Sequence, residues 1–206
     1  MAEKRSRKTG TSEIDIFAVS KKQQIKGNRR LVREKVLQIL FAMNFCNTPL
    51  DDLFAHIFYR IYKFDIDDEE KVELKTVLKP EEIREIEADI PIHWSASEIE
   101  FGKDLIAHTL NHQQQFDELI QNFSKNWEFD RIALIDKIIM RMTIAQFLYF
   151  PLIPIKVAIN EAIELSKLYS TNSSPTFING ILDAAKAELL EKNLIVKEGK
   201  GLIEDN

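Results

Sequence analysis

Four basic side chains crowd the start of a predicted helix: Lys26, Arg29, Arg30 and Arg33. Apolar residues over positions 32–43 repeat at the spacing of one helix face, and Asn28 is a suitable N-cap. Helices favour acidic residues in their first turn, so this basic cluster opposes the local preference, which often marks a functional site. Arg30 is expected to pair with Glu34, and that leaves the other two arginines free to bind phosphate groups.

A second group with potential chemistry lies further along the chain, at Asp104, His108 and His112. These residues are four positions apart, so a helix aligns them on one face, as it aligns zinc ligands. The H-E-x-x-H pattern is absent, because no Glu follows His108. We expect a solvated polar face, while metal binding by these three residues stays open to a zinc titration.

The sequence contains none of the common motifs of enzymes. Neither a glycine-rich phosphate loop of the G-x-G-x-x-G or G-x-x-x-x-G-K-[ST] type nor a G-x-S-x-G elbow occurs. The one cysteine, Cys46, excludes an internal disulfide and a cysteine-based zinc site, and it is expected to be a small buried side chain. We therefore predict a protein that is not an enzyme, with no catalytic residue, no resident metal and no cofactor.

Charge is unevenly distributed along the 206 residues, although the formal net charge is only −5. Residues 1–35 hold eleven Lys or Arg and four Asp or Glu, whereas residues 51–100 hold fifteen acidic and six basic residues. This asymmetry suggests a polyanion at the basic end and a basic partner elsewhere, with a solvated basic tail as the alternative. No apolar run reaches the roughly 20 residues of a membrane helix and no secretory signal is present, so we expect a cytoplasmic protein without membrane contact.

Glycine and proline are scarce, at six each, which favours helices over a β-sandwich. Helical periodicity predicts helices over residues 28–43, 50–62, 97–123, 130–150, 154–169 and 175–193. The third should begin with a capping box at Ser97 and Glu100. The prediction is an all-α fold of about six core helices over residues 25–193, with an acidic insertion near 63–96. Residues 1–24 are expected to be a mobile basic arm and 194–206 a frayed tail.

Two stretches are specific enough to indicate a family. The sequences V-A-I-N-E-A-I-E-L-S-K-L-Y at 157–169 and T-F-I-N-G-I-L-D at 176–183 closely resemble the NusB family of transcription antitermination factors. The predicted first helix and the segments 101–105 and 136–142 resemble that family as well. The resemblance implies two small antiparallel helical subdomains. It also implies binding to single-stranded boxA RNA of ribosomal-RNA leaders, with no DNA target.

The family resemblance also implies partners and residue roles. The expected partners are NusE, which is a small-subunit ribosomal protein, and the transcription elongation complex with other Nus factors. Arg29, Arg30 and Arg33 match basic RNA-binding positions of the family. Lys26 and the basic arm Lys4–Lys22 are expected to compensate for an arginine run that is interrupted here. Phe177 matches an aromatic residue that contacts RNA, with a core position as the alternative. Phe41 and Asp136 match positions at the interface with NusE, and core packing is the alternative for Phe41.

Two other functions remain open from the sequence. A NusB-like scaffold would hold the ribosomal protein while making weak or non-specific RNA contacts. The other open function is an accessory domain of an RNA methyltransferase, although no nucleotide-binding glycine motif is present in this chain.

Overall fold

The computed structural model describes residues 25–60, 90–124 and 128–202. The predicted basic arm at 1–24 and all but the last part of the predicted insertion lie outside these residues. In chain order the elements are β1 (Ile25–Lys26), α1 (Arg29–Ala42), α2 (Leu50–Leu53), the π-helical turn η1 (Phe54–Phe58), β2 (Ile92–His93), α4 (Ala96–Asn111), α5 (Gln113–Phe123), the 3-10 turn η2 (Phe129–Arg131), α6 (Leu134–Tyr149), α7 (Ile155–Tyr169), α8 (Ser174–Glu191) and the 3-10 turn η3 (Gly199–Leu202).

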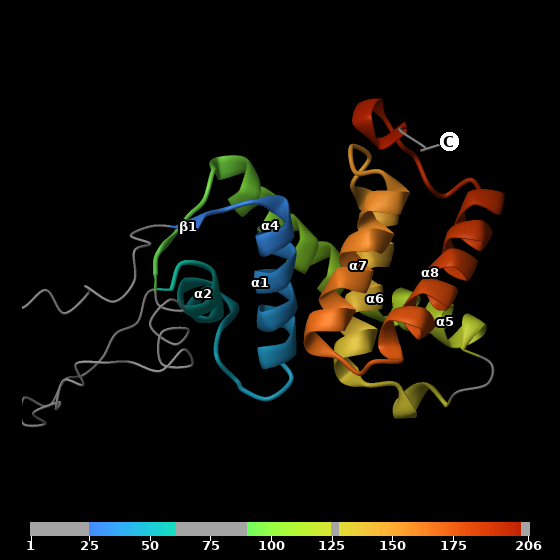
Figure 1. Ribbon diagram of the computed structural model, residues 1–206, viewed down its shortest axis with the longest axis horizontal. Helices are drawn as coiled ribbons and strands as arrows, with labels where there is room; N and C mark the ends of the chain where they lie inside the picture. Colours follow the sequence, from blue (N-terminus) through green and yellow to red (C-terminus); the bar gives the residue numbers. More distant parts are fainter. Residues whose placement is uncertain (1–24, 61–89, 125–127, 203–206) are drawn as a thin grey trace, which may run out of the picture.

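The helix α6 lies at the centre of the fold and contacts α1, α4, α5, α7 and α8 (Figure 1). It is buried almost all round from Ile138 to Phe147, which is the pattern of a core helix rather than a surface helix. One hydrophobic core joins α1 and α4 on one side of α6 to α7 and α8 on the other. The predicted all-α fold is confirmed, and the two-residue parallel pairing of β1 with β2 is a minor addition.

The start of α1 is fixed by local contacts. The backbone N–H of Leu31 donates to Asn28 Oδ1 over 2.9 Å, which confirms the predicted N-cap. Gly27 precedes this cap and donates its N–H to the His93 carbonyl, 2.8 Å away. A Cβ atom at Gly27 would lie 2.4 Å from the Trp94 ring, so this close approach requires glycine. The β1–β2 pairing therefore sets where α1 begins.

Three predicted helix boundaries differ in the structure. The capping box belongs to Ser95 and Glu98, two residues before the predicted pair, because Ser95 is the residue with extended backbone. The predicted long helix is interrupted at His112, which separates α4 from α5. The helix predicted from Asp130 begins at Leu134, after the separate 3-10 turn η2.

The second predicted helix forms differently as well. Among residues 50–60, the part of this prediction that the structure describes, only α2 is α-helical, and the chain continues directly into the π-helical turn η1. Within η1 the rings of Phe54 and Phe58 stack with centroids 4.4 Å apart, and Phe58 also packs on Trp94 at 4.3 Å. Aromatic packing against the start of α4 therefore accompanies the wider helical turn.

Val157, Leu168 and Cys46 are exposed apolar side chains, and the sequence predicted Cys46 to be buried. Val157 and Leu168 of α7 expose 42% and 66% of their surface, because α7 turns only one face towards α6 and α8. Cys46 follows the end of α1 and is exposed rather than part of the core, with its Sγ 3.2 Å from the Ala42 carbonyl oxygen. No helix among the described residues has the length and apolar character that a membrane span requires.

The segment that follows α8 folds back over the turn between α6 and α7. The Lys197 ammonium donates to the carbonyls of Gln146 and Phe150, over 2.9 and 3.0 Å, at the C-terminal end of α6. A Cβ atom at Gly201 would overlap the Pro151 carbonyl oxygen, which shows how closely this segment approaches the turn. The prediction of a frayed tail is therefore wrong for residues 194–202, while 203–206 lie outside the described residues.

Candidate nucleic-acid interface

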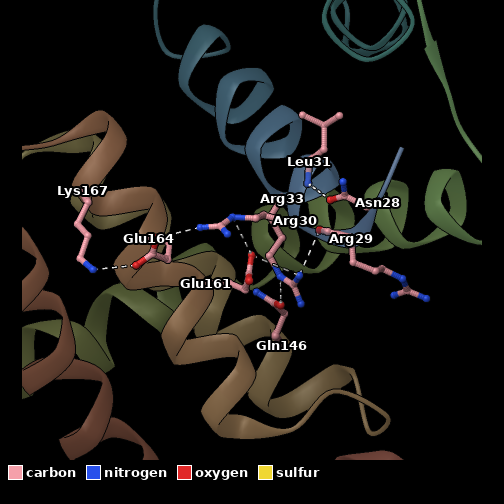
Figure 2. A network of polar contacts seen from close by, with 9 residues as sticks. All are labelled: Asn28, Arg29, Arg30, Leu31, Arg33, Gln146, Glu161, Glu164 and Lys167. Atoms are coloured by element: carbon pink, nitrogen blue, oxygen red, sulfur yellow. Dashed lines mark hydrogen bonds and ion pairs between the residues drawn. The ribbon is translucent and has the colours of Figure 1, made fainter. Parts of the chain in front are cut away.

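Two cations lie exposed at the N-terminal end of α1. Lys26 belongs to β1, and Arg29 is the first residue of the helix. The Arg29 guanidinium carbon lies 4.3 Å from the centroid of the buried Phe101 ring, so a cation–π contact orients it. Figure 2 shows the Arg29 side chain pointing away from the polar network that joins α1 to α7. This arrangement leaves a planar cation available to solvent.

Arg30 pairs with α7 instead of with Glu34. Its Nη2 donates to Glu164 Oε2 over 2.9 Å, and its Nε lies 3.9 Å from Glu161 Oε2. Glu164 accepts a second hydrogen bond from Lys167 over 2.8 Å (Figure 2). The expected pairing within α1 is therefore replaced by a bridge between helices. Because Arg30 keeps 54% of its side-chain surface exposed, a phosphate group can still approach it.

Arg33 is buried, which corrects the prediction that its guanidinium is free for phosphate. Its residue exposure is 4%, and its Nε donates to the side-chain oxygen of Gln146 in α6 over 2.7 Å. Its Nη1 donates to the Arg29 carbonyl and lies 4.0 Å from Glu161 Oε2. Burial lowers the pKa of Arg33 to about 10, and Glu161 opposes that shift. The side chain stays charged at neutral pH and links α1 to α6 inside the fold.

The interface predicted for a protein partner is only partly on the surface. Asp136 exposes 5% of its surface, and its Oδ2 accepts a hydrogen bond from Ser174 over 2.7 Å. It therefore joins the starts of α6 and α8 and does not present its carboxylate to solvent, which corrects the expectation. Phe41 is half-buried, and its ring lies 4.9 Å from that of Phe45, which is 71% exposed.

Two of the three residues considered as metal ligands, His108 and His112, stack on an aromatic ring instead. The His108 ring stacks on Tyr149 with centroids 4.3 Å apart, and His112 stacks on the same tyrosine at 4.7 Å. Desolvation lowers the pKa of His108, against the opposing charge of Asp104. Within residues 25–60, 90–124 and 128–202 no group of three or more His, Cys, Asp or Glu is placed to hold a metal ion.

Comparisons with known proteins identify the family. The sequence model of the NusB family matches residues 57–187. The transcription antitermination protein NusB of Chloroherpeton thalassium is 34% identical over 177 residues, which cover 86% of this chain and 70% of that protein. The chain belongs to the NusB family.

Solved structures agree with this family fold. The NusB of T. maritima aligns with a TM-score of 0.57 at 25% identity, over 81% of this chain and 99% of that one. A chain in the crystal structure of the antitermination factors NusB and NusE in complex with dsRNA aligns with a TM-score of 0.53 over 78% of this chain and 96% of that one. Its identity is 16%, so this second likeness shows the fold alone.

On the NusB fold, the predicted RNA-binding residues lie at two ends. Lys26 and Arg29 lie where α1 begins, whereas Phe177 lies in the first turn of α8 and packs, half-buried, against the core. In Figure 1, α8 lies beyond α7 as seen from α1, and the start of α8 is at the end of the molecule where α1 finishes. The structure therefore brings Phe177 towards the Phe41 and Asp136 end and away from Arg29.

Sequence reasoning missed two kinds of residue. Phe45 follows Phe41 by four positions, and that spacing was a usable signal for an aromatic pair on one helix face. Gln146 and Glu161 are the internal partners of the arginines, but they come from two distant helices. No local pattern could have connected them with Arg33, 113 positions before Gln146.

Proposed function

We propose that this NusB-family chain is an RNA-binding transcription antitermination factor that binds boxA-type RNA of ribosomal-RNA leaders together with NusE. It acts there within the transcription elongation complex, alongside other Nus factors. The observation that carries the proposal is the pair of exposed cations, Lys26 and Arg29, at the start of α1. Arg29 is held in position by Phe101 and combines a charge for phosphate with a planar face for an unpaired base.

The proposed contact with NusE uses the end of the molecule where α1 finishes. A solved structural relative is a NusB in complex with NusE and dsRNA, which supports both partners. Phe41 and the exposed Phe45 provide an aromatic pair of the kind enriched at protein interfaces. Asp136 contributes indirectly, by holding the starts of α6 and α8 in place. Phe177, at this same end, is proposed as a second RNA contact, so a strand that touches Arg29 and Phe177 has to cross α7.

The direct test is the affinity of the chain for a boxA-type single strand, measured with and without NusE at several salt concentrations. We expect sequence-dependent binding that NusE strengthens. The variant Lys26→Ala/Arg29→Ala should bind more weakly and reduce the salt slope by about 1.4, since a single-stranded RNA contributes roughly 0.7 per neutralised phosphate. Arg131→Ala removes an exposed arginine of η2 and is the matched control. An unchanged affinity and slope in the double variant would contradict the proposal.

A second candidate function is a scaffold that holds the ribosomal protein with weak RNA contact. It is favoured by the burial of Arg33 and by the ion pair of Arg30 with Glu164, which leave fewer unpaired guanidinium groups on the predicted RNA surface. This function predicts RNA binding that is independent of sequence and disappears at moderate salt, while NusE still binds.

A further inference from the structure

A groove of about 220 Å³ opens beside Arg29, between the start of α1, the part of α4 from Ser97 to His108, and the end of α6 with the turn that follows it. Its apolar lining includes Phe101, Tyr149, Phe150 and Leu152. Leu152 exposes 64% of its surface, although the other apolar residues of the groove are half-buried or buried. The groove therefore presents apolar surface to solvent next to an exposed cation.

One wall of the groove is already arranged for stacking. The Arg29 guanidinium carbon lies over the Phe101 ring at 4.3 Å, and Phe150 meets the same ring edge-on with centroids 5.3 Å apart. Because Arg29 is exposed, the side of its guanidinium group that faces away from Phe101 is accessible to a ligand. A flat ring placed there would extend the stack with little loss of side-chain freedom, since Arg29 is already oriented.

The polar rim of the groove excludes a phosphate group as its main occupant. Glu100 and Asp104 lie one turn apart on the exposed side of α4, and both line the groove. Among the described lining residues, Arg29 carries the one full positive charge against these two carboxylates. Desolvation lowers the pKa of His108, which also lines the groove, so it adds no charge at neutral pH. Carboxylates in this position accept hydrogen bonds, so the matching ligand offers N–H groups.

We propose that this groove binds one unstacked guanine base of a single-stranded RNA, stacked on Arg29, with its N–H edge towards Glu100 and Asp104. Guanine fits because its imino and amino groups place donors side by side, whereas the other three bases offer a donor on one ring position only. The inference rests on the proposed function, since it assigns one base position within an RNA strand that the chain already holds.

The test compares two RNA strands, a short oligouridine and the same strand with one central guanosine, by fluorescence anisotropy in the presence of NusE. We expect the guanosine strand to bind about tenfold more tightly, which is within the range of one stacked and hydrogen-bonded base. In Glu100→Gln/Asp104→Asn this preference should fall to about twofold or less. Loss of two negative charges would by itself strengthen binding of both strands equally, so the ratio of the two affinities is the informative quantity.

A matched variant and a modified base complete the experiment. Glu118→Gln removes an exposed carboxylate of α5 and should keep the guanosine preference. Inosine lacks the amino group of guanine and should bind with an intermediate affinity in the wild-type chain. Equal binding of the uridine and guanosine strands would overturn this inference and leave the proposed function intact. If the chain, with NusE present, binds neither of these two strands and no boxA-type strand, both this inference and the proposed function are overturned.

Discussion

Arg29, Arg30 and Arg33 lie within five positions of one another, yet the helix points each of them at a different environment. Arg29 faces solvent over an aromatic ring, Arg30 reaches α7, and Arg33 is enclosed between α1 and α6. Removing a buried charge that is hydrogen-bonded leaves its partners unsatisfied, which costs much more than removing an exposed one. Alanine substitutions of the three residues should therefore differ in their effects on the free energy of unfolding as well as on RNA affinity.

We predict that Arg33→Ala lowers the free energy of unfolding by about 2–4 kcal/mol, because Gln146 and Glu161 lose the cation that they contact inside the fold. Arg29→Ala should lower it by no more than about 1 kcal/mol, the scale of an exposed cation–π contact. Urea unfolding of both variants, followed by circular dichroism, measures the difference. A larger loss in Arg29→Ala than in Arg33→Ala would show that the assignment of the two side chains is reversed.

Cys46 gives an independent test of exposure. It is the single cysteine of the chain and lies exposed after the end of α1. We expect it to react with a thiol reagent such as DTNB in the native protein at a rate close to that in urea. A thiol that reacts only after denaturant is added would place Cys46 in the core, as the sequence had suggested.

At the residue scale, sequence predicted which cations gather at α1 but not which of them face solvent. The N-cap at Asn28 was predictable, because capping depends on residues within one turn. The burial of Arg33 and Asp136 was not, because Gln146 and Ser174 approach them from helices far away in sequence. Charge patterns alone favour exposure for such residues, and only a tertiary partner reverses that expectation.

The boundaries of α4 illustrate what decides an element. Ser95 and Ser97 are both followed three positions later by a glutamate, so two capping boxes compete in the sequence. The structure uses Ser95, whose side chain accepts the Glu98 N–H while the Glu98 carboxylate accepts the Ser95 N–H over 2.7 Å. The preceding strand β2 ends at His93, and the backbone is still extended at Ser95. An N-cap residue has this extended conformation, so the helix begins after Ser95 rather than after Ser97.

We predict that Ser95→Ala lowers the free energy of unfolding by about 1 kcal/mol, the usual cost of a lost N-cap. Ser97→Ala, two residues later, is the control and should change it by about 0.5 kcal/mol or less. Thermal unfolding of the two variants distinguishes the boxes. Equal losses, or a larger loss in Ser97→Ala, would contradict the cap seen in the structure.

Helix periodicity located most of the helices, because amphipathic spacing reflects burial directly. Pro154 and Pro175 correctly indicated the starts of α7 and α8. The break at His112 and the π-helical turn η1 carry no strong local signal, since neither contains glycine or proline. Packing of aromatic side chains accompanies both features, through Tyr149 in one case and Trp94 in the other.

On the scale of the whole molecule, residues 194–202 close one end of the fold. Lys197 places its ammonium among the carbonyls at the end of α6, where burial lowers its pKa to about 8. This value lies below the ordinary 10.5, so between the two values the unfolded chain holds more protons than the folded one. The free energy of unfolding should therefore rise with pH across that window.

Between pH 7.5 and pH 9.5, we expect the free energy of unfolding of the wild-type chain to rise by about 1 kcal/mol relative to that of Lys197→Met, after allowance for solvent screening. Lys200→Met removes an exposed lysine of the same segment and should follow the wild-type dependence. Urea unfolding at the two pH values gives the comparison. A Lys197→Met chain with the same pH dependence as the wild type would mean that this segment does not hold the lysine as described.

The proposed function requires that RNA contacts the molecule where α1 begins. Photocrosslinking of a 4-thiouridine-labelled boxA-type strand to the chain, with NusE present and with mass spectrometry of the linked peptides, tests this contact most directly. We predict crosslinks in residues 25–33 that disappear in Lys26→Ala/Arg29→Ala and persist in Arg131→Ala. Crosslinks that avoid residues 25–33, or that are unchanged in the double variant, would contradict RNA binding at the start of α1.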